Sequence, residues 1–373
     1  MEIKKTLTTL ALAGTAFAGT LFAEPYSDQS SVGFPKDTNV IIHLDNDAIQ
    51  NSQLGKYCAL NADKFQGFGQ DQQYTPEDKA FFDAESKKIT SMTVGVALEN
   101  DDDEIDCEAA VGYIRGNGFN WDEYFERVKK YAKAQQLGQE VLIQKQTLAD
   151  KNCQTIVIKQ NDKQQIKIYF VTLSAKTTVL VIAEDDEDAT KALKKLLKNR
   201  ERKIGPKIAV KIKNDPILFV YGNGENIKNN GSDLKQFLFT MDEQNNALNF
   251  KVDVKLADTA QTQQFAQEAT QNLQGAAMLL TMMGGNEQLS NAEKQGLNLL
   301  AKSVAGTAIK NSENVISGTA SVSVPELTKF LDAAAGEKLW EKYLNQAQPL
   351  DDSENVFIDA DDDMDDEIID IDD

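Results

Sequence analysis

The chain has 373 residues, with 39 basic and 59 acidic side chains and a net charge of −20 at pH 7. A chain of this length exceeds the size at which one hydrophobic core usually keeps growing, so we expect two domains. Residues 351–373 hold thirteen of the acidic side chains and no Lys or Arg, which leaves the rest of the chain only mildly acidic. This charge argues against nucleic acid or an anionic membrane surface as a partner, because phosphates attract basic patches.

Residues 1–23 have the three parts of a secretory signal peptide. Two lysines at positions 4 and 5 precede an apolar, uncharged stretch over 6–18, and small residues offer cleavage after Ala18 or, preferably, after Ala23. An uncleaved membrane anchor is the alternative, but the apolar stretch is short for a bilayer span. No later segment is long and apolar enough to cross a membrane, and no Cys follows the stretch to carry a lipid. We therefore expect an exported protein, periplasmic or extracellular.

In the first half of the mature chain, apolar runs and period-two alternation predict strands, and capped amphipathic patterns predict helices. The expected strands are 39–44, 89–98, 108–115, 141–148, 154–160, 166–173 and 178–183. The expected helices are a short one ending at Leu54 and longer ones over 75–85, 121–134 and 185–199. Thr75, Asn120 and Asp185 are the residues expected to cap the longer helices.

The second half follows a basic stretch, 194–213, which contains Gly205-Pro206 and which we interpret as the junction between the halves. Its expected strands are 207–213, 216–221, 234–241, 246–256 and 314–322. Its expected helices are 259–283, 289–310 and one that opens at Ser323 and runs to about Leu344. Asp258 and Ser323 are the expected caps, the latter within a capping box that ends at Glu326.

The order of strands followed by a capped helix recurs along the chain, and the strands follow one another as a meander. This pattern predicts an α+β protein of two related domains, each an antiparallel sheet with helices packed on one face. The domains are expected at 24–203 and 204–346, and residues 347–373 as a disordered acidic tail.

Two segments carry a resemblance to certain exported bacterial proteins of unassigned function. The run Val40-Ile41-Ile42-His43-Leu44-Asp45 with the later Leu54-Gly55 is similar to the start of such proteins. The run Ala320-Ser321-Val322-Ser323, which leads into Leu327, is similar to a later part of them. The resemblance implies repeated α+β units behind a signal peptide, and it implies no activity and no catalytic residue.

Few residues suit catalysis or cofactor binding. His43 is the only histidine and lies in an apolar strand, where a packed core side chain is the favoured interpretation over a catalytic triad. One His and three scattered Cys supply a zinc site poorly. Ser232 with Lys235 matches the SxxK pattern of penicillin-binding enzymes, but the companion motifs are absent. The Gly-Asn-Gly runs at 116–118 and 222–224 lack the third glycine of a dinucleotide loop and are interpreted as turns. We expect no catalytic residue and no cofactor.

The three cysteines are Cys58, Cys107 and Cys153. In an oxidising compartment two of them can pair, and Cys107 with Cys153 is the favoured pair because each begins a strand-like run. Three buried reduced thiols are the alternative.

Acidic side chains suggest calcium at two places. In the tail, Asp359, Asp361, Asp363 and Asp365 stand at positions 1, 3, 5 and 7 of an EF-hand loop, with Asp370 at position 12. Met364 replaces the glycine that the loop needs at position 6, so any binding is expected to differ from an EF-hand. The acidic turn at 99–106 is a second candidate, for which a solvated hairpin tip is the favoured interpretation.

Two further hypotheses concern function. Residues 276–283 form a nearly continuous apolar helix end, for which burial in a helical hairpin is favoured over a sticky surface for a protein or lipid. The leading functional hypothesis is a non-enzymatic exported protein that binds an envelope or extracellular protein. A hydrolase that uses only carboxylates and a carrier of an apolar ligand are the alternatives. The tail is also a candidate to fold back onto the basic stretch 194–213.

Overall fold

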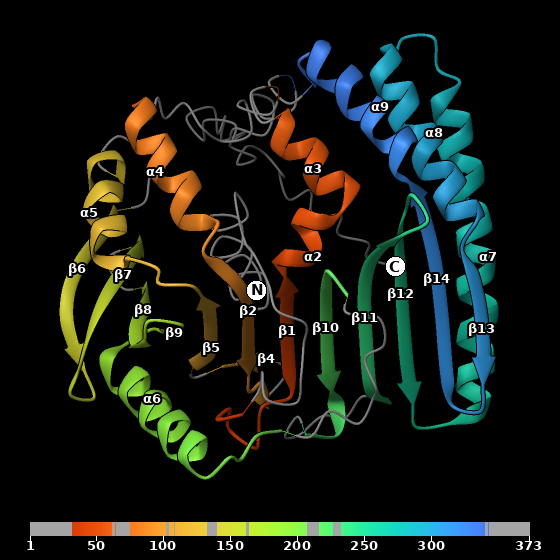
Figure 1. Ribbon diagram of the computed structural model, residues 1–373. Helices are drawn as coiled ribbons and strands as arrows, with labels where there is room; N and C mark the ends of the chain where they lie inside the picture. The colour runs from red at the N-terminus through yellow and green to blue at the C-terminus, as the bar shows by residue number, and fades with distance from the viewer. Residues whose placement is uncertain are drawn as a thin grey trace, which may run out of the picture.

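The computed structural model describes residues 32–61, 64, 75–101, 104–107, 109–132, 140–161, 164–206, 216–226, 233–339 and 342. Within these residues the fold is α+β, and one twelve-stranded antiparallel sheet runs through the whole molecule (Figure 1). In spatial order its strands are β13 (Ala308–Ser312), β14 (Val315–Ser323), β12 (Ala247–Leu256), β11 (Leu234–Gln244), β10 (Leu218–Asn223), β1 (Val40–Asp45), β2 (Ile89–Val96), β5 (Ala109–Gly116), β9 (Thr177–Ala183), β8 (Gln164–Ser174), β7 (Lys151–Asn161) and β6 (Glu140–Leu148). A separate hairpin joins β3 (Glu99–Asp101) to β4 (Glu104–Asp106).

The helices begin where the sequence places polar caps. They are α2 (Asn46–Asn51), α3 (Gln53–Leu60), α4 (Pro76–Ser86), α5 (Trp121–Ala132), α6 (Asp186–Glu201), the 3₁₀ turn η3 (Gly224–Asn226), α7 (Thr259–Gly284), α8 (Asn291–Ala305) and α9 (Val324–Gly336). The side chains of Thr75, Asp185, Asp258 and Ser323 each accept a hydrogen bond from a backbone N–H in the first turn of α4, α6, α7 and α9. These four predicted caps are confirmed, because a cap depends only on local sequence.

Both halves of the chain order their strands in the same way. In the first half β1, β2 and β5 are neighbours, and the chain leaves through α5 and returns as β9 beside β5, followed by α6. In the second half β10, β11 and β12 are neighbours, and the chain leaves through α7 and returns as β14 beside β12, followed by α9. The predicted relationship between the halves by duplication stays a prediction.

The predicted separation into two sheets is wrong. The first strands of the two halves, β1 and β10, pair antiparallel, with Ile41 opposite Tyr221 and His43 opposite Phe219. If the halves were separate, β1 and β10 would each be an edge strand with a row of N–H and C=O groups without partners, and pairing β1 with β10 satisfies both rows at once. Sequence patterns did not reveal this pairing, because the alternation of apolar and polar residues predicts a strand but not which strand it pairs with.

Helices α2 and α3 also tie the halves together. The carboxylate of Glu243 in β11 accepts hydrogen bonds from the backbone N–H groups of Gln53 (2.5 Å) and Leu54 (3.0 Å) at the start of α3. At the other end of α3, the Tyr57 hydroxyl donates to Asp332 Oδ1 of α9 at 2.6 Å. The first-half helix α3 is therefore held by side chains of the second half.

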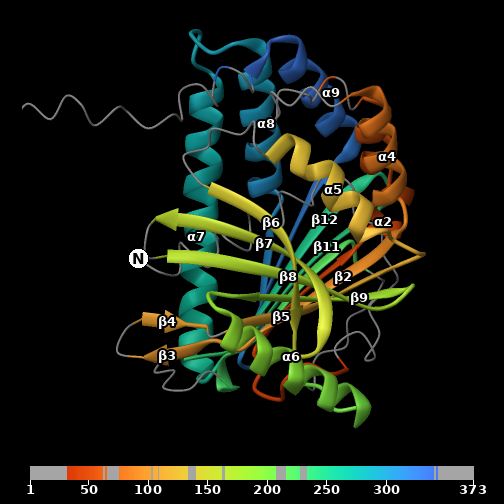
Figure 2. The ribbon, with the colours of Figure 1, turned by 90° about the vertical axis from the view of Figure 1, so that its left-hand side faces the viewer.

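Helices cover both faces of the sheet in the first half, which corrects the expectation of helices on one face. In β9, consecutive residues Val179, Leu180, Val181 and Ile182 are all buried, so both faces of that strand need cover. Val179 and Val181 pack in one cluster with α6, and Leu180 and Ile182 pack in another with α5. Figure 2 shows α5 and α6 on opposite sides of these strands.

The same two clusters separate the cysteines of the favoured disulfide. Cys153 is buried in the cluster under α6, and Cys107 packs against the cluster under α5. Cys58, in α3, is exposed. A disulfide requires Cα atoms within about 7 Å and side chains that point toward each other, and placement on opposite faces of the sheet does not favour it. The pairing of Cys107 with Cys153 stays a prediction without support from this geometry.

The second half differs from expectation in one place, at the end of α8. The first residues of the basic stretch, 194–201, belong to α6, in agreement with the helix expected over 185–199. The helix expected over 289–310 ends at Ala305, and the chain then forms the edge strand β13, which pairs with β14. The strand expected at 207–213 lies outside the described residues.

Candidate functional site

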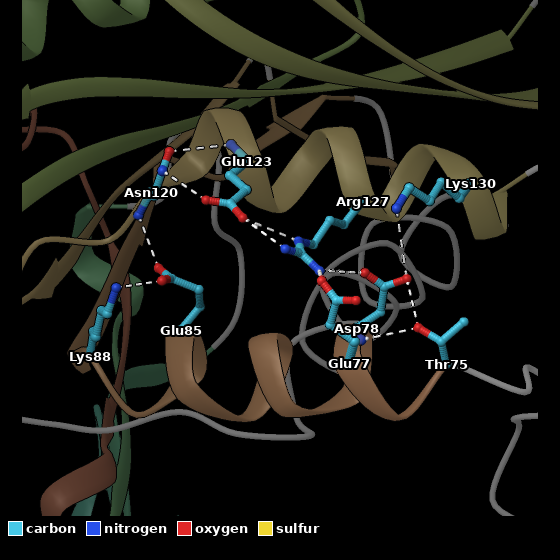
Figure 3. Close-up of polar contacts among 9 residues, drawn as sticks. All are labelled: Thr75, Glu77, Asp78, Glu85, Lys88, Asn120, Glu123, Arg127 and Lys130. Carbon is cyan, nitrogen blue, oxygen red and sulfur yellow. Dashed lines mark hydrogen bonds and ion pairs between the residues drawn. The ribbon is translucent and has the colours of Figure 1, made fainter.

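The polar side chains between α4 and α5 form a connected network of charges (Figure 3). The Asp78 side chain is 6% exposed, and its Oδ1 lies 2.6 Å from Arg127 Nη1. Its other oxygen, Oδ2, accepts from the Thr75 hydroxyl at 3.1 Å and lies 3.8 Å from Lys130 Nζ. Arg127 reaches Glu123 Oε1 at 2.9 Å through Nη2. A buried carboxylate is therefore surrounded by donors from both helices.

Glu85, at the other end of α4, is a second buried carboxylate. It forms an ion pair with Lys88 and accepts a hydrogen bond from the backbone N–H of Asn120 at 3.0 Å, just before α5 begins (Figure 3). The guanidinium of Arg127 lies 4.2 Å from the centre of the Phe81 ring, which adds a cation–π contact. The sequence did not indicate this network, because Asp78 and Arg127 are 49 residues apart and both resemble ordinary solvated helix residues.

The partners of Asp78 and Glu85 are cations and hydrogen-bond donors of the fold itself. A general acid needs a carboxyl group whose pKa is raised, usually by burial or by a second acid. Elsewhere in the described residues, hydrogen bonds lower the pKa of Asp122 (from Gln154), of Asp186 (from Lys167 and Tyr169) and of Asp332 (from Lys64 and Tyr57). The α4–α5 network thus fits a structural role, in which it fixes the two helices to each other.

An aromatic cluster lies beside this network and anchors α5 to the sheet. Trp121 is 4% exposed. The centre of its ring lies 4.0 Å from the ring centre of Phe119, 5.6 Å from that of Phe125 and 4.7 Å from that of Phe170 in β8. Its indole N–H donates to Thr178 Oγ1 in β9 at 2.6 Å. Phe119 and Trp121 also line a small pocket at the ends of β2, β5 and β9. The rings of the cluster pack against one another, so the pocket has little space for a ligand.

His43 occupies the core position that its strand predicts. It is fully buried in β1, its Nδ1 lies 2.8 Å from Thr93 Oγ1 in β2, and its ring stacks on Phe219 of β10 at 5.3 Å. The interpretation as a packed core histidine is confirmed.

Tyr113 supplies a prediction about pH. It is 3% exposed, its hydroxyl donates to the backbone C=O of Val32 at 2.8 Å, and burial raises its pKa to about 12, although Arg200 and Arg115 oppose the shift. An unfolded tyrosine has a pKa of about 10. Between pH 10 and 12 the folded state therefore keeps a proton that the unfolded state loses. The free energy of unfolding should fall with rising pH across this window, by up to about 1.4 kcal/mol per pH unit for this group.

We expect Tyr113→Phe to reduce that dependence, because phenylalanine has no proton to lose. Urea unfolding at pH 8, 10 and 11 measures the slope for both proteins. The variant should keep part of the slope, since the pKa values of Tyr57 and Tyr169 are also raised by burial and by Asp332 and Asp186. Equal slopes in the variant and the parent would contradict the assignment to Tyr113.

The predicted calcium ligands Asp359, Asp361, Asp363 and Asp365 lie outside the described residues, as do Asp102 and Asp103 in the acidic turn. That turn is the hairpin of β3 and β4. Among the residues that the structure describes, no group of three or more His, Cys, Asp or Glu side chains is arranged to hold a metal ion. Gly118 has a φ of +77°, which confirms the interpretation of its Gly-Asn-Gly run as a turn.

The apolar end of α7 is exposed, and the favoured interpretation of a buried hairpin is wrong there. Met278, Leu279, Met282 and Met283 are 67%, 61%, 66% and 56% exposed. Met278 and Met282 are one helical turn apart, as are Leu279 and Met283, so the four side chains share one side of the helix. We call these four residues the α7 apolar face. Side chains this exposed do not line an enclosed cavity, so these four residues give no support to the apolar-ligand carrier.

The rest of α7 explains why this face stays uncovered. The helix packs mainly along α8 at the outer end of the sheet (Figures 1 and 2), and its buried residues are Thr262 and Ala266, both in its first third. In the described parts of the chain no helix is long and apolar enough to span a membrane.

Comparison with known proteins found only distant structural similarity. No family model matches the sequence, and no curated protein matches it. Among solved structures, the chain is similar to crystal forms III, I and IV of TP0453 from Treponema pallidum, with TM-scores of 0.39, 0.36 and 0.36 and 8% sequence identity in each case. The matches cover 84%, 83% and 84% of this chain and 98% of the TP0453 chain. A likeness this distant assigns no activity and no site residue.

Proposed function

We propose that the protein is an exported, non-enzymatic binding protein and that the α7 apolar face contacts an apolar segment of another protein. The observation that carries the proposal is the exposure of four adjacent large apolar side chains, each more than half exposed, on one side of a helix. Soluble proteins rarely leave such a group uncovered unless it contacts a partner. The signal-like residues 1–23 support a site of action outside the cytosol.

The composition of α7 favours a protein over a lipid surface. Helices that lie in a membrane interface carry Lys and Arg on their polar face, which attract anionic lipids. The 26 residues of α7 contain no Lys or Arg, and Glu268 is the one charged residue. Three of the four exposed side chains are methionines, whose unbranched thioethers adapt to the shape of a protein partner.

The size of the face points to a small contact. A stable homodimer buries about 800 Å² on each partner, which is more than four side chains on one helix provide. A short apolar segment, such as one helix of the partner, fits a narrow stripe of this kind.

A photo-crosslinking residue at position 279 tests the proposal in cells that export the full protein. We expect one discrete cross-linked protein from position 279 and none from position 267, where Gln267 is also exposed but lies 12 residues earlier, about 18 Å away along α7. The mature chain in the same sample should begin at Glu24.

Binding of the purified partner then makes the test quantitative. Leu279→Gln with Met282→Gln should weaken affinity by at least about tenfold, as expected when anchor side chains are lost, and Gln267→Ala should leave it unchanged. Equal cross-linking from both positions, or an affinity that the double substitution does not change, would refute the proposal. A product with lipid or with a second copy of the chain would also overturn the choice of partner.

A further inference from the structure

Helix α6 presents a strongly basic outer face in a protein that is otherwise acidic. Its inner side is apolar, and Ala189, Leu193 and Leu196 are fully buried against β5 and β9. Between residues 191 and 203 the chain has seven basic side chains and one acidic one. The exposed basic residues of this segment are Lys191, Lys194, Lys195, Lys198, Arg200, Arg202 and Lys203.

Two of these cations are already neutralised within the fold. Lys191 lies 3.2 Å from Glu187 and 3.1 Å from Asp188, and Lys195 lies 2.9 Å from Asp37. Lys194, Lys198 and Arg202 form no ion pair with any acid in the described residues. They follow one another at spacings of four residues, so they form a single row along the helix. We call these three residues the α6 basic row.

We propose that the acidic segment 351–373 of the same chain docks on the α6 basic row. The charges are complementary: the segment holds thirteen acids and no base, and it supplies thirteen of the 59 acidic side chains in the chain. No other stretch of similar length approaches this negative charge, and the row lies within the most basic segment of the protein. Attachment to the same chain raises the effective concentration of the segment at the row, which favours it over a free anion.

The chain is long enough to make the contact. The segment follows α9, which packs on β14, whereas α6 packs on β5 and β9. Seven strand-to-strand steps separate β14 from β9 in the sheet order, which at about 4.8 Å per step amounts to about 34 Å across the sheet. Figure 1 shows α9 near one end of the strands and α6 near the other, so the path also runs the length of a strand, about 30 Å for the nine residues of β14, and the direct distance is about 45 Å. From Gly336, where α9 ends, to residue 351 is 15 residues, which span up to about 50 Å when extended.

Anisotropy of a fluorophore joined to the C-terminus of the full mature chain tests the proposal. At low salt we expect a high anisotropy that falls as salt is raised to about 0.5 M, where screening acts within about 4 Å. The variant Lys194→Glu with Lys198→Glu and Arg202→Glu should show the low value at every salt concentration. The matched control is Lys151→Glu with Lys310→Glu and Lys329→Glu, which changes the net charge equally at exposed sites elsewhere and should behave as the parent.

Each result of the anisotropy experiment either supports or overturns docking of segment 351–373 on the α6 basic row. An anisotropy that is insensitive to salt, or that both triple variants lower equally, overturns docking on the α6 basic row. An anisotropy that depends on protein concentration shows a contact between copies and overturns the intramolecular form. Circular dichroism of each variant verifies that α6 is still folded. The α7 apolar face is not involved, so this test and that of the proposed function can fail independently.

Discussion

Replacing Trp121 with alanine is expected to lower the free energy of unfolding by about 3–5 kcal/mol, the range for truncating a buried aromatic side chain. The loss has two sources. The ring leaves a cavity among Phe119, Phe125 and Phe170, and the hydroxyl of Thr178 loses its 2.6 Å hydrogen bond. Because Trp121 joins α5 to strands of the sheet, the damage should extend beyond the helix. Chemical unfolding followed by far-UV circular dichroism measures the change.

Trp121→Phe serves as the control, because it keeps most ring contacts and removes the indole N–H. It should cost clearly less than Trp121→Ala. Equal losses for the two variants would show that the hydrogen bond to Thr178, and not aromatic packing, dominates at this site. A loss below about 1 kcal/mol for alanine would contradict the burial of the cluster.

Replacing Phe219 with alanine should also cost about 3–5 kcal/mol, and it tests the junction between the halves. Phe219 is fully buried in β10, stacks on His43 of β1, and clusters with Ile41, Tyr221 and Leu238. If the sheet is continuous, amide protons of β2 and β5 should lose protection against hydrogen exchange together with those of β11 and β12.

Phe265→Ala is the matched substitution, since Phe265 is 55% exposed on α7. It should change stability by less than about 1 kcal/mol, because little apolar area is removed from the interior. If Phe219→Ala lowered protection in β11 and β12 alone, the halves would behave as the two separate domains that the sequence suggested.

Some features could be predicted because they depend on neighbours in the sequence. Thr75, Asp185, Asp258 and Ser323 cap helices through bonds to residues two or three positions away. Most strands of the sheet were likewise predicted, because alternation and β-branched runs are local properties. The edge strand β13 was missed, since Ala308–Ser312 carries few apolar residues and a helical pattern runs into it.

The candidate sites were predicted less well, since they depend on distant contacts. The ion pair of Asp78 with Arg127 joins two helices that the sequence describes as separate, amphipathic and solvated. Burial of the α7 end was also expected from apolar composition alone, whereas burial depends on what packs against a surface. The α7 helix has α8 along one side and, among the described residues, nothing over Met278 and Met282.

By itself the sequence determined the local elements of this protein: an α+β chain with capped helices, a core histidine in β1, an acidic segment and a signal-like start. Only the tertiary structure decided that twelve strands form one sheet, that helices lie on both of its faces, and that Cys107 and Cys153 pack on opposite sides of it. The physical reason is the range of the interactions. Helix caps and side-chain alternation act over a few residues, whereas strand pairing and burial join segments far apart in the chain, such as Ile41 and Tyr221.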